Sequence, residues 1–578
     1  CSGFQKKKQR ELRQSWARWT ACFQGQPITA VRNYFGEKVA LYYLWLGWYT
    51  YLLIPAAAVG LVVFLYGLAF FNSSPLIKEV CESKAVMCPL CDKRCQVWQL
   101  SDTCTYTKLS LLFDNGGTVF FAMFMAVWAT LFLEFWKRHR ASYVCEWKVS
   151  DWNEEEDDLI LGIVNNPDAE PKQYKHSYLR STLVLICVTL MILVIIGLTH
   201  ALVVFRVMAA VMMAEGSWKL LSDHSNLGSM VLGAFLHYVV ITVMTRINRI
   251  VARKLCDIEE TRSFSATEKS FTVKMFTFQF FTYFSSLFYV AFFLGRINGH
   301  PGRYSRIAGK WRLEECHPSG CLTDLFIQMA IIMTLKQTIS NVFEFTVPGA
   351  ELCENCKLRD WFCNYRLDDV NSFSLFNEFL EMVIQFSFTT IFVAAFPLAP
   401  LLALINNIIE IRLDAIKMVT LERRIVPKKT NDIGIWTEVL EAIGVMAVIA
   451  NGLVIGVSSD FIPRIVYHYR YGPCANGSTA ADCMAGYINN TLSIAHMADP
   501  DIRNEFLPDY KDYRSDGDYS FTPQFWLILA VRFAFVILFE HVVVIFKFVA
   551  AWCVPSAPMQ VKNVRLLDKF NQLKQENR

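Results

Sequence analysis

The 578-residue chain has little charge for its length: 19% of its residues are Asp, Glu, Lys or Arg, whereas 54% are apolar and 14% are aromatic. Soluble domains of this size rarely combine such apolarity with so few charges. The 56 basic and 52 acidic residues leave a net charge of +4, which is too balanced to indicate nucleic-acid binding. Enzyme signatures such as the P-loop, HExxH and the nucleophile elbow are missing too. These absences predict a membrane protein that is not an enzyme.

Long apolar runs are what the sequence has in abundance. A helix needs about 20 mostly apolar residues to cross about 30 Å of hydrocarbon. Such runs occur at 41–71, 117–136, 181–205, 227–245, 272–295, 323–346, 374–396, 398–420, 434–458 and 523–552. We therefore expect an all-α polytopic membrane protein with ten transmembrane helices. Its membrane domain would cover residues 41–552, between a cytosolic pre-membrane segment (1–40) and a cytosolic C-terminal tail (553–578).

Two independent signals give the orientation of these runs. Basic clusters, which mark cytoplasmic ends, follow the second, fourth and eighth runs, at 137–140, 246–254 and 423–429. Sequons for N-glycosylation, which mark the opposite side, lie in odd-numbered connections at Asn72, Asn476 and Asn489. Both signals place the two termini in the cytosol. The plasma membrane is the preferred location, with an intracellular membrane as the alternative.

Cysteines cluster in the connections that this orientation places outside. They are Cys81, Cys88, Cys91, Cys95, Cys104, Cys316, Cys321, Cys474 and Cys483. In an oxidising compartment, cysteines so placed are expected to form disulfides. The Cys88-Pro-Leu-Cys91 spacing would also suit half of a zinc site, which is the less favoured interpretation. The sequence leaves the disulfide pairing open.

Five acidic residues lie inside the predicted helices, where a charge costs roughly 2.5–3.5 kcal/mol and therefore indicates a function. Glu378 and Glu381 are three residues apart, and Glu410 and Asp414 are four apart, so each pair shares one helix face. Glu344 lies near the cytoplasmic end of the preceding run. Because the three runs alternate in direction, all five carboxylates should lie at a similar depth on the cytoplasmic side.

Five anions at one depth would repel each other strongly in a low dielectric. Oxygen ligands in excess suit Ca²⁺, which takes six to eight of them, and two such ions would nearly cancel the five charges. Asn406 and Ser340, each one turn from an acid, are further candidate ligands. In one alternative, the acids pair with Lys336 and Arg412 or stay protonated, but two bases are too few for five acids. A proton- or sodium-coupled transporter is the other alternative.

At these residues the chain resembles the anoctamin family of calcium-activated chloride channels and phospholipid scramblases. Matching motifs are Phe-Gly-Glu-Lys at 35–38, Cys-Pro-Leu-Cys-Asp-Lys at 88–93, Phe-Pro-Leu-Ala-Pro at 396–400 and Asn-Asn-Ile-Ile-Glu-Ile-Arg-Leu-Asp at 406–414. The resemblance implies a homodimer with ten spans per subunit and a groove lined by spans three to seven. It also implies two calcium ions per subunit, bound by the five carboxylates between spans six, seven and eight. On span six the family usually has Asn where this chain has Ser340, and Asn341 follows it.

Residues on span five bear on the choice between channel and scramblase. A chloride-selective path needs positive charge along it. The family's chloride channels carry two lysines five residues apart, whereas this chain has Lys274 at the first place and Gln279 at the second, as the better-known scramblases do. Gln279 could instead merely pack or meet water. We therefore favour a scramblase with weakly selective ion conductance, which would act on membrane phospholipids and permeating ions. A chloride channel, a cation channel or a tether without transport are the alternatives.

Overall fold

The computed structural model describes residues 2–71, 74–89, 97–150, 177–214, 225–261, 263–296, 299–307, 311–313, 320–346, 374–475, 482–495 and 508–576, with a few single residues between them. Within helix α12, the side chains of 340–346 lie outside this description.

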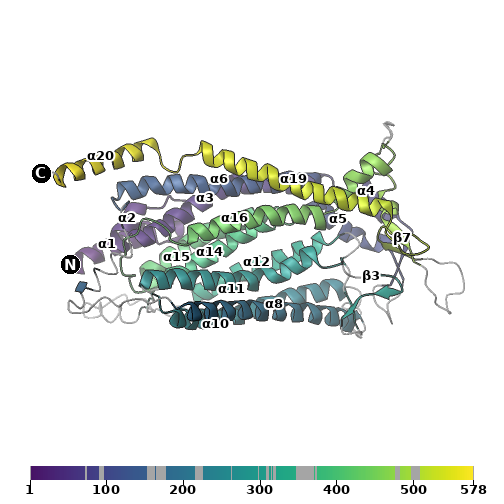
Figure 1. Cartoon of the computed structure of the whole chain (residues 1–578), viewed down its shortest axis with the longest axis horizontal. Helices are drawn as coiled ribbons and strands as arrows, with labels where there is room; N and C mark the ends of the chain where they lie inside the picture. Colours follow the sequence, from purple (N-terminus) through teal and green to yellow (C-terminus); the bar gives the residue numbers. More distant parts are fainter. Residues whose placement is uncertain are drawn as a thin grey trace.

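Helices occupy each of the ten predicted apolar runs and lie along the long axis of the bundle (Figure 1). They are α3 (Glu37–Ala69), α6 (Gly116–Glu146), α8 (Tyr178–Ala214), α10 (Ser225–Glu259), α11 (Phe264–Phe292), α12 (Leu322–Thr346), α14 (Ser374–Ile391), α15 (Ala399–Ile416), α16 (Trp436–Leu453) and α19 (Pro523–Cys553). Shorter helical elements are α1 (Ser2–Ser15), η1 (Trp19–Ala21), α2 (Ile28–Phe35), α4 (Pro75–Glu82), η2 (Leu100–Thr103), α5 (Cys104–Phe113), η3 (Lys417–Leu421), η4 (Val454–Ser458), α17 (Phe461–Val466), η5 (Tyr467–Tyr471), α18 (Tyr487–Asn490) and α20 (Met559–Glu576).

Seven helical segments of the described chain are long and apolar enough to cross a membrane. They contain α3, α6, α8, α10, α11, α16 and α19. The other three, α12, α14 and α15, carry acidic, basic and amide side chains that lower their hydropathy. This helix content is that of a multi-pass membrane protein, and the count of ten spans stays a prediction.

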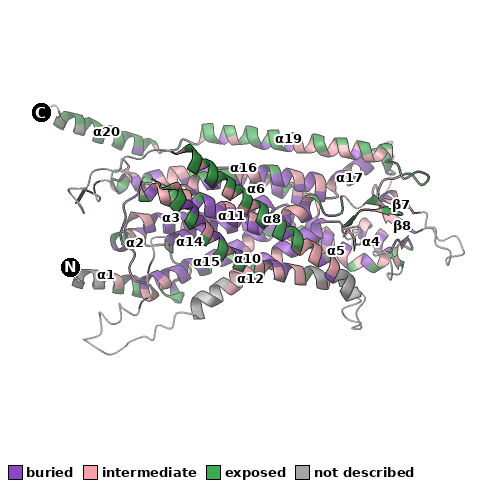
Figure 2. Ribbon diagram, turned by 60° about the horizontal axis from the view of Figure 1, so that its bottom comes forward, coloured by how far each residue is buried: buried purple, intermediate pink, exposed green. Residues whose placement is uncertain are grey.

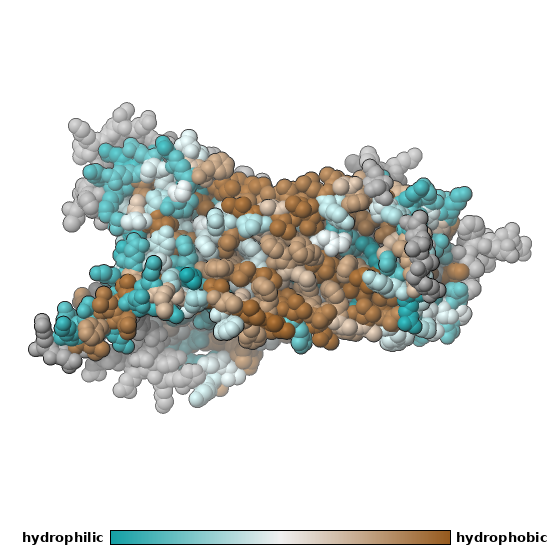
Figure 3. All heavy atoms as spheres, turned by 90° about the horizontal axis from the view of Figure 1, so that it is seen from above, coloured by the Kyte–Doolittle hydropathy of each residue, from teal (hydrophilic) through white to brown (hydrophobic). Residues whose placement is uncertain are grey.

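The outer surface has the polarity that a bilayer requires. On the face shown in Figure 3, apolar residues cover the middle of the molecule and hydrophilic residues gather at both ends. Helix α19 is exposed along most of its length, with Phe533, Leu538 and Phe548 more than half exposed (Figure 2). Exposed apolar side chains on this scale are explained by contact with lipid rather than water.

The two chain termini lie at the same end of the bundle, and a small sheet lies at the other (Figure 1). Its strand order is β2-β1-β8-β7, where β1 is Val86–Met87, β2 is Trp98–Gln99, β7 is Leu492–Ile494 and β8 is Asp509–Lys511. Two short hairpins pair β3 (Gly299–His300) with β4 (Arg303–Tyr304), and β5 (Arg306–Ile307) with β6 (Trp311–Arg312). The parallel pairing of β1 with β8 joins connections that are more than 400 residues apart in the sequence.

Three disulfides form among the candidate cysteines: Cys81–Cys104, Cys316–Cys321 and Cys474–Cys483. Cys88 is buried, while Cys91 and Cys95 lie outside the described residues. Of the three sequons, Asn489 is exposed on α18, and Asn72 and Asn476 lie outside the described residues.

Candidate metal centre

Helices α14 and α15 bring the acidic residues together. Both are shorter than the predicted runs, since α14 ends at Ile391 and α15 begins at Ala399. A turn rich in proline occupies the gap, because Pro397 cannot donate a helical hydrogen bond and Pro400 is suited to the first turn of a helix. Helix α3 packs against this turn at Gly60, where a Cβ would lie 2.2 Å from the carbonyl oxygen of Pro397. Only glycine permits that approach, which holds α15 alongside α3.

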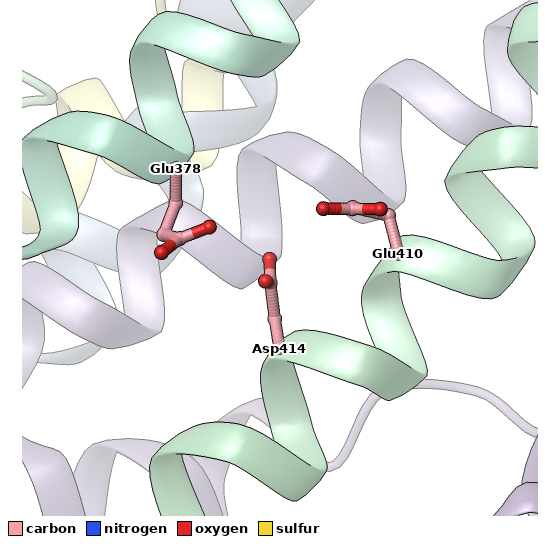
Figure 4. Close-up of side chains that lie close together, drawn as sticks. All are labelled: Glu378, Glu410 and Asp414. Carbon is pink, nitrogen blue, oxygen red and sulfur yellow. The ribbon is translucent and has the colours of Figure 1, made fainter. Parts of the chain in front are cut away.

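Three carboxylates converge in the half of this hairpin that is remote from its turn. Glu378 of α14 and Glu410 and Asp414 of α15 each place one oxygen within 4.8 Å of the others (Figure 4). Their residues are 6%, 1% and 0% exposed, respectively. Buried carboxylates this close repel one another unless a cation or a proton lies between them. Their hard oxygens match the ligands that Ca²⁺ prefers, so the cluster is suited to bind a metal ion.

Glu381 lies one turn further along α14, beside Asn406 of α15. Both residues line a cavity of about 10 Å³, which is close to the space that one water molecule needs. The Oε1 atom of Glu381 lies 3.5 Å from Nζ of Lys336 on α12. The predicted pairing of an acid with Lys336 therefore exists, at one of the four acids that the structure describes.

Lys417 is a second basic partner, and the sequence analysis missed it. Its Nζ lies 2.8 Å from Oε1 of Glu378. The signal was present, because Lys417 follows Asp414 by three residues and so shares its helix face. Two lysines against the four described acids leave a net charge of −2 among these groups. A divalent cation is one way to balance it.

Tyr42 of α3 is another missed neighbour, for which the sequence carries no signal. Its hydroxyl donates a hydrogen bond of 2.6 Å to Oδ2 of Asp414, and its ring packs edge-on against Phe379. Residue Tyr42 is fully buried. This bond fixes the orientation of the Asp414 carboxylate.

Arg412 faces away from the acids, as its position two residues from Glu410 predicts. Its guanidinium donates to the main-chain oxygens of Trp16 (3.1 Å) and Gln24 (2.8 Å). The segment before α3 therefore packs on the back of the helix that carries Glu410 and Asp414. The remaining predicted ligands, Ser340, Asn341 and Glu344, lie on α12, but their side chains are outside the description and their roles stay predictions.

Comparison with known proteins places this architecture in a family. The family model described as "Anoctamin: Calcium-activated chloride channel" matches residues 31–566. The chain belongs to the anoctamin family. It is 51% identical to Anoctamin-9 of Mus musculus over 99% of the chain and 79% of that relative. It is 44% identical to Anoctamin-4 of Homo sapiens and 45% identical to Anoctamin-3 of Mus musculus, over 97% of the chain. The chain spans 63% and 60% of those two relatives, so it covers less than two thirds of their length.

In this anoctamin, the two span-five residues singled out above are both buried. Nζ of Lys274 lies 2.5 Å from Oε2 of Glu259 at the end of α10, and Ser270 also contacts it. Gln279 is 1% exposed, and its Oε1 accepts a hydrogen bond of 3.3 Å from Thr245 of α10. The positive charge of Lys274 is thus balanced by Glu259, and Gln279 packs between helices in this state.

Hydrogen bonds connect further polar side chains between α10, α11 and α12. Gln328 of α12 donates to Ser286 of α11 at 2.9 Å, and Ser286 Oγ lies 3.2 Å from Nδ1 of His237 on α10. The other ring nitrogen of His237 lies 3.1 Å from the main-chain oxygen of Thr282. Because that oxygen can only accept, Nε2 carries the proton and Nδ1 accepts from Ser286. Asn248 adds a bond of 3.2 Å to the Thr282 hydroxyl. A chain of buried polar groups therefore links the three helices.

Proposed function

We propose that this anoctamin is a calcium-activated phospholipid scramblase with weakly selective ion conductance. The supporting observation is the chain of polar groups between α10, α11 and α12, whose members Gln328, Ser286, His237, Thr282 and Asn248 are all buried. The nearby charge of Lys274 is balanced by Glu259. If these helices separate, the exposed hydroxyl, amide and imidazole groups can hydrogen-bond lipid headgroups or hydrated ions. Since Glu259 balances Lys274, the opened path would have little excess positive charge to select anions.

Calcium would control this path through the acidic cluster. In the proposal, two Ca²⁺ ions per subunit are held by Glu344, Glu378, Glu381, Glu410 and Asp414, with Asn406 and either Ser340 or Asn341 as neutral ligands. The convergence of Glu378, Glu410 and Asp414 supports it, as does the family's description as calcium-activated. When bound there, calcium supplies positive charge that the two lysines now provide in part.

Assembly and location follow the same proposal. The chain would act as a homodimer in the plasma membrane or an intracellular membrane, with both termini in the cytosol, and it would not be an enzyme. The shared end of the two termini and the disulfides at the other end support this orientation, because disulfides persist in oxidising compartments. Exposed Asn489 would then be a lumenal or extracellular glycosylation acceptor.

The decisive experiment measures two fluxes in the same liposomes. Purified protein is reconstituted, and lipid flip and chloride flux are recorded with and without calcium. The proposal expects calcium-dependent lipid flip together with an ion flux of low selectivity. The second candidate is a calcium-activated chloride channel, which the description of the family model favours. Strong chloride selectivity without lipid flip at saturating calcium would reject the scramblase in its favour.

A further inference from the structure

A cavity of about 50 Å³ lies at the end of the molecule opposite the acidic cluster. It is partly open to solvent, and α4, α5, α17, α18 and the β7–β8 hairpin surround it. At about 10–15 Å³ for each water, the space would hold about three to five water molecules. One side of the wall is apolar and includes Val80, Leu100 and Leu492. The other side carries ionised groups, so the cavity is amphipathic.

Its polar wall belongs to a cluster of ion pairs that are partly buried. Arg464 donates to the main-chain oxygen of Asp114 at 2.9 Å and to its Oδ2 at 3.3 Å. Nζ of Lys511 lies 2.9 Å from Oδ2 of Asp460. Arg464, Lys511 and Asp460 line the cavity, and Asp114 lies behind Arg464.

Further cations make the cluster positive. Burial alone would raise the pKa of Asp460, but Lys511, Arg464 and Arg532 together hold it below its usual value. Asp460 is therefore ionised at neutral pH. Arg296 also acts on Asp460, and Glu79 accepts a hydrogen bond from the main chain of Ile488 on the cavity wall. Four cations then face three carboxylates, Asp460, Asp114 and Glu79, and leave one positive charge in excess. Partly buried excess charge is costly unless a counter-ion accompanies it.

Hydrogen-bond donors without partners point to the same kind of ligand. Tyr487 lines the cavity and is 3% exposed; Arg464 and Tyr513 lie close to its hydroxyl, but it makes no hydrogen bond of good geometry among the described residues. Burial, together with the negative charge of Asp460, raises the pKa of Tyr487 well above its usual value, so the hydroxyl stays a donor. The Nε atom of Arg464 is likewise buried without a partner in the described part of the chain. An acceptor that enters the cavity would satisfy both donors.

We propose that this cavity binds a small monovalent carboxylate with a short apolar chain. The carboxylate would accept hydrogen bonds from Tyr487 and Arg464 and balance the excess positive charge beside Lys511. The chain would lie against Val80, Leu100 and Leu492, and the volume limits it to a few carbon atoms. A bare halide ion would use the charge but not the apolar wall. The site is independent of the acidic cluster and of the transport activity proposed above.

Butyrate is a suitable probe, titrated calorimetrically into the purified full chain in calcium-free detergent solution. We expect saturable binding of one butyrate per chain, which neutral butyramide does not reproduce and chloride displaces only at much higher concentration. Tyr487→Phe should weaken butyrate binding about tenfold, the lower end of what a hydrogen bond to a charged group contributes. Lys511→Gln should weaken it as well. Lys84→Gln removes an exposed lysine from the same external end and should leave binding unchanged.

Thermal unfolding without ligand shows whether each variant keeps the wild-type fold. Three outcomes would overturn the proposal. One is the absence of saturable butyrate binding by the wild type. Another is an unchanged affinity for butyrate in a Tyr487→Phe variant that unfolds at the same temperature as the wild type. The third is displacement by chloride at equal concentration, which would mean that the apolar wall contributes nothing and that the site takes a simple halide.

Discussion

Lys417 and calcium should compete for Glu378. The lysine Nζ lies 2.8 Å from Oε1 of Glu378. Calcium would use the same carboxylate as a ligand. Lys417→Met keeps an unbranched side chain of similar length but removes the charge. The acid is then free to bind a metal ion, and the repulsion between Lys417 and that ion is removed. We therefore expect Lys417→Met to increase the affinity for calcium.

The size of the effect follows from the contact. The Lys417 side chain is 23% exposed and that of Glu378 is 7% exposed, so water screens the pair only in part. A hydrogen bond to a charged group contributes about 1.5–3 kcal/mol. Since about 1.4 kcal/mol is a factor of ten in an equilibrium constant, the loss of this competitor should strengthen calcium binding about tenfold or more.

Two titrations measure the effect: calcium binding to the detergent-solubilised protein, and calcium-dependent lipid flip in liposomes. The half-saturating calcium concentration should fall in both. Lys428→Met is the matched control, because Nζ of Lys428 lies 4.3 Å from the ring of Phe264 rather than on a cluster acid. A Lys417→Met protein that needs more calcium than the wild type would refute the reasoning. That result would show that Lys417 stabilises the arrangement of the acids, and that the lysine and the acids form a structural ion-pair network.

Five further substitutions test other parts of the site. Asp414→Asn should raise the half-activating calcium concentration at least tenfold in the flip assay, because it removes an anionic ligand. Lys336→Met should lower that concentration, but less than Lys417→Met does, because its contact with Glu381 is longer at 3.5 Å. Ser340→Asn should raise calcium sensitivity if Ser340 fills a ligand position; if Asn341 does so instead, Asn341→Ala should lower it in the same titration. Gln279→Lys should move the reversal potential towards that of chloride while lipid flip persists, since it adds a positive charge to the proposed path.

Local rules were enough for much of the fold and for part of the site. Apolar runs located the long helices, and helical spacing put Glu410 and Asp414 on one face. The alternation of helix direction then brought Glu378 to the same depth, where the three carboxylates converge. Helix ends were less accurate, because the turn at 392–398 and the wide turn η3 use residues that the hydropathy pattern assigned to helices.

Contacts between distant segments were beyond such rules. Tyr42 lies 372 residues from Asp414 in the sequence, and nothing in either local pattern predicts their hydrogen bond. The balance of Lys274 by Glu259 depends on how the ends of α10 and α11 pack, which spacing along one helix does not reveal. Family resemblance assigned Lys274 a place on the groove, but resemblance alone says nothing about the partner that neutralises its charge.

Helix α12 connects the acidic cluster with the proposed path. Nζ of Lys336 lies 3.5 Å from Glu381 of α14 and 5.4 Å from the ring centre of Tyr283 on α11. Further along, Gln328 of the same helix is bonded to Ser286 in the chain of polar groups. A divalent ion at Glu381 would displace the ammonium group of Lys336, and in the proposed site Glu344 would then hold α12 to the ion, so calcium would change how α12 is held. Binding equilibria that share one element are reciprocal. Any ligand that binds preferentially when α12 is separated from α10 and α11 should therefore tighten calcium binding by the same factor by which calcium tightens the binding of that ligand, if calcium favours the separation.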